Sequence, residues 1–167
     1  MKRLLFIIAL ICAVCTSKAQ FYQTQPDRDS SKMLIGFIND TMLNSDSSFK
    51  WFAKAQKIYK PKEAVVRTLA ANKDSINLMI FLGTWCEDSR FVIPRFYKII
   101  DSAGFNKDKI PLIAVDRTKK DNHHITTALH VTNVPTIIVF KHGKELGRVV
   151  EYGETGRYDE EVAALLK

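Results

Sequence analysis

The sequence predicts an α/β protein in which helices flank a central mixed sheet, and three observations support this fold class. Two short, almost continuous apolar runs, 76–82 and 110–115, are typical of strands covered on both faces. The stretch between them, 87–103, has helical spacing, so the three segments form a parallel crossover unit. Two further strands, 136–140 and 145–152, flank a tight turn and predict a closing antiparallel hairpin.

The first nineteen residues have the layout of a secretory signal peptide. Two basic residues precede an apolar run, 4–14, which is too short for a transmembrane span. Ser17 and Ala19 are small residues placed three and one before an expected cut ahead of Gln20. We therefore expect export to the periplasm or cell envelope, with no stable membrane span after cleavage.

The expected cleavage determines how many cysteines the mature chain keeps. The chain has three cysteines, and the cut removes Cys12 and Cys15, so the mature chain keeps only Cys86. A single thiol makes no internal disulfide, so Cys86 either does chemistry or is buried and inert. The alternatives to cleavage are a buried N-terminal strand, an uncleaved anchor, or a lipoprotein acylated at Cys12 or Cys15.

A leader followed by helices is expected between residues 20 and 74. In chain order the elements are a loose polar leader (21–31), a short helix or strand (33–43), a helix capped by Ser47 or Ser48 and broken at Pro61, and a second helix (63–72). The first of these helices carries Phe49, Trp51, Phe52 and Tyr59. We interpret this aromatic cluster as a face that docks onto the main domain rather than as a binding site.

The main domain is expected to occupy 75–167. In chain order its elements are a strand (76–82), a helix (87–103) kinked by Pro94 and ended by Gly104, a strand (110–115), a short helix (121–130), the hairpin (136–140 and 145–152) and an amphipathic helix (157–166). The apolar face of the helix 87–103 is expected to comprise Phe91, Val92, Phe96, Ile99 and Ile100.

Composition limits the classes of partner. The chain has 167 residues, 46% hydrophobic and 26% charged, which suits one globular domain. Lysines and arginines are scattered rather than gathered in a stripe with interleaved aromatics, so we expect no nucleic-acid partner. The expected state is a monomer.

The feature that indicates chemistry is the segment 84–89, Thr-Trp-Cys-Glu-Asp-Ser, between the first buried strand and its helix. A cysteine at a helix N-terminus faces unpaired backbone N–H groups and the positive end of the helix dipole. Both favour the thiolate, which is the nucleophilic form of cysteine. Substrates bind at this edge of open α/β sheets.

At these residues the sequence resembles the thioredoxin superfamily. The matches are Trp85-Cys86 and Ser89 at the family's W-C-x-x-C, Pro94 at its helix-kinking proline, Val115-Asp116 at the end of its next core strand, Val134-Pro135-Thr136 at its V/I-P-T, and 136–144 at its hairpin. The resemblance covers about 75–167 and implies a thioredoxin-like fold with an N-terminal helical extension. It also implies that Pro135 is cis and faces Cys86, leaving a backbone edge open to an extended peptide.

The departures from the family pattern bear on mechanism. Ser89 stands where the family has its resolving cysteine, so Cys86 is able to form a mixed disulfide but has no internal partner to release it. Ile80 stands where the family has a buried acid that handles the proton of the resolving thiol. The two losses are consistent with each other.

The residues around Cys86 leave alternatives open. Glu87 and Asp88 oppose thiolate formation by like charge, or they are ordinary helix-stabilising carboxylates of a first turn. Ser89 donates a hydrogen bond to the Cys86 sulfur, or it is a plain surface serine. We take Cys86 and Ser89 as the candidate catalytic residues. The candidate substrate-binding residues are Trp85, Glu87, Asp88, Val134, Pro135 and Thr136.

Rival sites are weaker. The four histidines are His123, His124, His130 and His142. Adjacent histidines on a helix point in different directions, and no second cysteine or carboxylate motif completes a ligand set. We therefore predict no metal and no cofactor. Asp116 is interpreted as a strand-end residue rather than as an acid paired with Asp88.

The leading functional hypothesis is an exported monothiol protein whose Cys86 exchanges with disulfides or thiols of exported proteins, or with small thiols and disulfides. A second hypothesis is a redox-inactive binding module for exported polypeptides that keeps the fold and its peptide groove. A third is a dimer bridged through Cys86. The first two differ in whether Cys86→Ser abolishes function or leaves partner binding intact.

Overall fold

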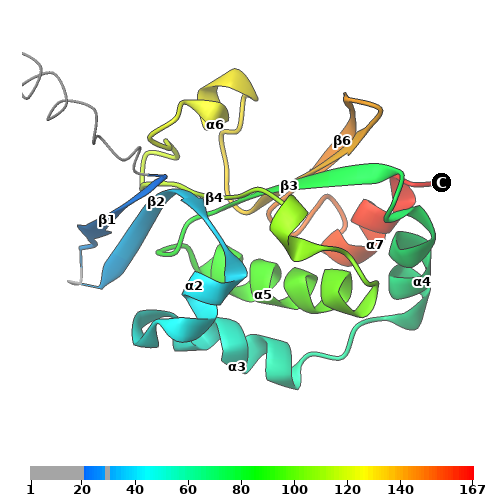
Figure 1. Ribbon diagram of the computed structural model, residues 1–167, viewed down its shortest axis with the longest axis horizontal. Helices are drawn as coiled ribbons and strands as arrows, with labels where there is room; N and C mark the ends of the chain where they lie inside the picture. The colour runs from blue at the N-terminus through cyan, green and yellow to red at the C-terminus, as the bar shows by residue number, and fades with distance from the viewer. Residues whose placement is uncertain (1–20, 29–30) are drawn as a thin grey trace, which may run out of the picture.

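The computed structural model, which describes residues 21–28 and 31–167, contains a six-stranded mixed sheet with helices on both faces (Figure 1). The strands are β1 (Tyr22–Pro26), β2 (Lys32–Ile38), β3 (Ile76–Leu82), β4 (Leu112–Ala114), β5 (Thr136–Lys141) and β6 (Lys144–Val150). They lie in the order β1-β2-β4-β3-β5-β6, and only the β3–β4 pair is parallel. The predicted α/β class, crossover unit and hairpin are confirmed.

The helices are unequally divided between the two faces. They are α2 (Asp40–Ser45), α3 (Lys50–Ile58), α4 (Glu63–Asn72), α5 (Glu87–Ser102), α6 (Ile125–Ala128) and α7 (Tyr158–Ala164), with single 3₁₀ turns at Ser47–Phe49 and Lys107–Lys109. In Figure 1, α5 lies beneath the sheet with α3 on its far side, whereas α6 lies above the sheet. The main helices match the prediction to within a few residues at each end.

Burial on both faces explains the apolar run of β3. Leu78, Ile80 and Leu82 belong to the larger core cluster, which includes α5, whereas Phe81 belongs to a smaller cluster on the other face. Because neighbouring side chains of a strand point to opposite faces, a strand between two cores is apolar on both sides, and the one exposed residue of β3 is Asn77 near its start. Ile80 is fully buried in this core.

The N-terminal segment contributes strands as well as helices, so the prediction of a loose leader is wrong. β1 pairs along its whole length with β2, although every one of its side chains is exposed. Its sequence, Tyr-Gln-Thr-Gln-Pro, has no buried face, and backbone pairing with β2 places it at the sheet edge. Hydrophobic patterning therefore gives no signal for it.

The aromatic helix α3 docks as expected, although its start differs from the prediction. Phe52 is fully buried and makes an edge-on contact with Tyr97 of α5, with ring centroids 5.6 Å apart. The predicted cap, Ser47 or Ser48, is wrong, because Asp46 accepts the hydrogen bond from the Ser48 N–H and begins the 3₁₀ turn. Asp46 also pairs with Lys32 of β2, and this pairing favours it over a serine.

The predicted apolar face of α5 needs one correction. Phe91 is 43% exposed, whereas the other four residues of that face are fully buried. Phe91 instead stacks beside Tyr152 and lies under the Arg95 guanidinium, 3.7 Å from its ring centroid, so other side chains partly cover its ring. Pro94 is buried inside the helix, and Gly104 follows the helix end with φ +75°.

The predicted signal peptide and its cut lie outside the described residues. Within 21–28 and 31–167, no helix has both the length and the apolar character needed to cross a membrane. The predicted domain boundary at residue 75 stays a prediction.

The docking of α3 is tested by removing its central side chain. Phe52→Ala should lower the free energy of unfolding by about 3–5 kcal/mol, because it leaves a cavity between α3 and α5. Ile58→Ala, at a 67% exposed position of the same helix, should change it by no more than about 0.5 kcal/mol. Equal losses in urea unfolding would contradict the docking.

Candidate functional site

Cys86 lies at the junction between β3 and α5, as the N-cap residue of a sixteen-residue helix. Its backbone is extended (φ −88°, ψ 125°), its N–H donates to Gly83 O at 3.0 Å, and its carbonyl accepts from Arg90 N at 3.0 Å. The side chain is half-buried. The sulfur therefore lies at the end of α5 where unpaired N–H groups and the positive dipole favour an anion.

A second loop meets Cys86 from the other side. The Cys86 thiol donates to Val134 O at 3.4 Å, and the Val134–Pro135 peptide bond is cis. Val134, Pro135 and Thr136 are buried, and the Thr136 hydroxyl donates to Asn133 O at 2.7 Å. The two segments that the sequence singles out, 84–89 and 134–136, are thus brought together by the fold.

Trp85 covers the base of the junction. Its Nε1–H donates to Val115 O at 2.9 Å, and the ring packs with Cys86 against the smaller core cluster. A Cβ at Gly83 would lie 2.7 Å from Cε2 of this ring, so the ring requires glycine at that position. The Arg117 guanidinium lies over the Trp85 ring, 5.0 Å from its centroid.

Ser89 fits neither of the two roles considered from sequence. It is fully buried rather than on the surface, and its Oγ accepts a hydrogen bond from Gly83 N at 3.1 Å rather than donating one to the Cys86 sulfur. Ser89 therefore satisfies a backbone N–H in the loop that precedes the cysteine. Because that N–H is buried, its hydrogen bond helps to define the loop conformation.

Tyr152 is a site residue that sequence reasoning missed. It follows β6, forms a hydrogen bond with Asp88 and packs beside Phe91, with ring centroids 5.5 Å apart. Burial raises the pKa of Tyr152, the Asp88 hydrogen bond raises it further, and the charges of Asp88 and of ionised Cys86 add to the effect. No sequence motif marks Tyr152; its place opposite the start of α5 follows only from the β5–β6 pairing.

The two acidic neighbours of Cys86 differ in environment. Glu87 is exposed to solvent, whereas Asp88 is half-buried beside Tyr152. The phenol O–H donates to the Asp88 carboxylate. One carboxylate is thus solvated and the other is held by a neighbour.

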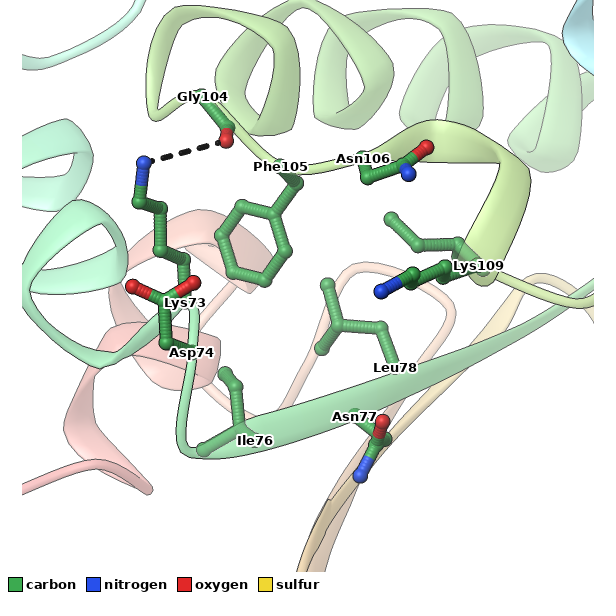
Figure 2. Close-up of a pocket in the computed structure, with 10 residues that line it drawn as sticks. Lys73, Asp74, Ile76, Asn77, Leu78, Gly104, Phe105, Asn106 and Lys109 are labelled. Carbon is green, nitrogen blue, oxygen red and sulfur yellow. Dashed lines mark hydrogen bonds between the residues drawn. The ribbon is translucent and has the colours of Figure 1, made fainter.

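The other candidate groups lie apart from this junction. Among the described residues, no three His, Cys, Asp or Glu side chains are placed to hold a metal ion. Asp116 is a turn residue, because its Oδ1 accepts from the backbone N–H groups of Thr118 and Lys120. A pocket of about 200 Å³ lies at the opposite end of β3, where Lys73 reaches Gly104 O at 3.4 Å (Figure 2).

Comparison with known proteins is consistent with this geometry. The family model described as Thioredoxin matches residues 58–164. A thioredoxin from Echinococcus granulosus is 29% identical over 101 residues, covering 56% of this chain and 89% of that protein. A thioredoxin from Staphylococcus saprophyticus is 28% identical over 94 residues, covering 53% and 86%.

The crystal structure of a Pseudomonas aeruginosa protein of unknown function has a similar fold, with a TM-score of 0.52. It is 15% identical to this chain, and the likeness covers 76% of this chain and 87% of that one. The match extends over more of the chain than either thioredoxin does.

The structural role of Ser89 is tested by Ser89→Ala. This change leaves the Gly83 N–H buried without an acceptor and should lower the free energy of unfolding by about 1–3 kcal/mol. Ser102→Ala is the matched control, because Ser102 lies on the same helix but is exposed; it should cost no more than about 0.5 kcal/mol. A Ser89→Ala loss as small as the control's in urea unfolding would exclude the role.

Proposed function

The chain belongs to the thioredoxin family, and from this premise we propose that it carries out thiol–disulfide exchange through Cys86 as its single nucleophile. The observation that carries the proposal is the position of Cys86 at the N-terminus of α5, with its sulfur 3.4 Å from Val134 O beside Pro135. A half-buried sulfur in that place is reachable by a substrate and lies at the N-terminal N–H groups of α5.

The exchange step balances as follows. The Cys86 thiolate attacks one sulfur of a substrate disulfide; a bond forms between the two sulfurs, the substrate's S–S bond breaks, and the other sulfur leaves as a thiolate that takes a proton. Two equivalents of a thiol supplied from outside the chain then convert the mixed disulfide to free Cys86 and a reduced substrate. The added thiol leaves as its own disulfide.

Ser89 is the reason for requiring an outside thiol. It occupies the position one helical turn after Cys86, where a resolving sulfur would stand, and a hydroxyl does not open a disulfide. Its oxygen is already bonded to Gly83 N. Ile80 supplies no proton-handling group in the core below. The proposed cycle is therefore a monothiol cycle.

The substrate is proposed to approach along the edge that contains Val134. We expect an exported polypeptide in extended conformation, or a small disulfide, to place its sulfur near Cys86 while its backbone lies beside the 134–136 segment. Trp85, Glu87 and Asp88 border this approach. Residues 1–19 support the further proposal that the mature chain works in the periplasm or cell envelope.

A redox-inactive binding module is the second candidate function. The observation that favours it is the burial of Ser89 in a purely structural hydrogen bond, which leaves nothing of the second half of a dithiol cycle. In that case the groove beside Pro135 would bind polypeptides without a covalent step.

The two functions are separated by trapping. Incubation with a disulfide-containing peptide should give a covalent adduct on Cys86 that intact mass spectrometry detects and dithiothreitol removes, because the sulfur attacks and no internal thiol follows. Cys86→Ser should give no adduct. Absence of adduct together with undiminished peptide binding by Cys86→Ser would favour the binding module.

A second prediction concerns a variant with a thiol introduced at position 89. Ser89→Cys should form a disulfide with Cys86 after attack and release the peptide without added thiol, because positions three apart at a helix start are neighbours. Ser102→Cys, on the exposed last turn of α5, is the matched control and should leave the adduct in place. A persistent adduct in Ser89→Cys would contradict the proposed site geometry.

A further inference from the structure

We propose that residues 21–28 and 31–57, which lie before the family-matched region, brace the Thr84–Trp85–Cys86 segment and hold its reactive geometry. Three separate parts of this region reach the segment: strand β2 by a direct hydrogen bond, the loop after β1 through Arg117, and helix α3 through Arg90. The effect on exchange rests on the proposed function, whereas the effect on Trp85 does not.

The first contact runs from the loop after β1 to the indole of Trp85. Asp27 forms a bidentate ion pair with Arg117, at 2.5 Å (Nε–Oδ1) and 2.9 Å (Nη2–Oδ2). The Asp27 side chain is only 4% exposed, and its hydrogen bonds from Arg117 lower the pKa of the carboxyl against the opposing effect of burial. The same guanidinium lies 5.0 Å from the centroid of the Trp85 ring.

This arrangement confines Trp85 on two sides. Its Nε1–H is bonded to Val115 O, and its ring lies beneath Arg117, which is paired with the Asp27 carboxylate. A bidentate pair fixes the plane of a guanidinium as well as its location, so Asp27 orients the cation over the ring. Asp27 is thus a positioning residue that acts through Arg117.

The second contact runs from β2 to Thr84. The pairing of β2 with β4 ends at Gly36, and beyond it the Leu34 N–H donates to Thr84 Oγ1 at 3.1 Å. Thr84 is fully buried, so its hydroxyl takes the place that a strand carbonyl would have in a continued ladder. The residue before Trp85 is therefore tied to the N-terminal strand.

The third contact runs from α3 to the same threonine. Arg90 of α5 donates from Nε to Thr84 O at 2.7 Å, and its guanidinium lies 5.9 Å from the centroid of the Trp51 ring. Trp51 is held in turn by edge-on contacts with its buried neighbours Phe49 and Phe52. The Thr84 hydroxyl is thus bonded to β2, and the Thr84 carbonyl is bonded to an arginine that lies over Trp51 of α3.

The experiment uses Trp85 as its own reporter. The chain has two tryptophans, so Trp51→Phe leaves Trp85 as the only one while keeping an aromatic ring under Arg90. In this background Asp27→Asn removes the charge of the pair with almost no change of shape. Glu145→Gln is the matched control, because Glu145 forms a bidentate pair with Arg148 at the end of the β5–β6 hairpin away from Pro135.

We expect Asp27→Asn to raise acrylamide quenching of Trp85 emission, and to slow attack of Cys86 on 5,5′-dithiobis(2-nitrobenzoic acid), each by about two- to fivefold. Glu145→Gln should change neither. Arg117→Gln breaks the same pair from its other side and should reproduce the effect, and adding Asp27→Asn to it should change nothing more.

Unchanged quenching in both Asp27→Asn and Arg117→Gln would overturn the proposal, as would additive effects of the two substitutions. Equal changes in Glu145→Gln would do so too, because they would show a general loss of stability. If Cys86 reacts with the reagent in no variant, the proposed exchange function is wrong. The quenching results would still show whether the N-terminal region holds Trp85 in place.

Discussion

The backbone amides at the start of α5 are the constraint on which the site depends. They define the place where the Cys86 sulfur meets both a helix N-terminus and the carbonyl of Val134. β3 delivers the chain to that place because it is buried on both faces, and α5 leads it away beneath the sheet. The backbone of β3 and α5 thus sets the position of the Cys86 sulfur, and the surrounding side chains support that position.

Ser89 and Ile80, which stand where the family has a cysteine and an acid, both have structural roles. Ser89 bonds the Gly83 N–H, and Ile80 fills core volume, so both positions stabilise the junction without taking part in sulfur chemistry. Tyr152 provides a hydrogen bond to one of the two carboxylates beside Cys86. The N-terminal region reaches the same loop directly from β2 and indirectly through Arg117 and Arg90. Several elements therefore support the loop that contains Cys86.

Most of the fold is predictable from sequence because its main strands and helices bury apolar faces. The predictions fail where backbone pairing or long-range contact decides the outcome. β1 has no buried face, so hydrophobic patterning gives no signal for it. Ser89 accepts a hydrogen bond from the Gly83 N–H, and the spacing of apolar residues along a helix does not reveal this contact. The 84–89 and 134–136 segments were recognisable as motifs, whereas Tyr152 and Asp27 reach the site only through sheet pairing and loop packing.

The central claim is that Cys86 performs half of an exchange cycle, and its most direct test is the number of disulfides that each molecule opens without another thiol. With an excess of a chromogenic disulfide, release of one thiol equivalent per Cys86 should be followed by a stop, and added glutathione should restart the reaction. Continued release without added thiol, or no release at all, would contradict the account.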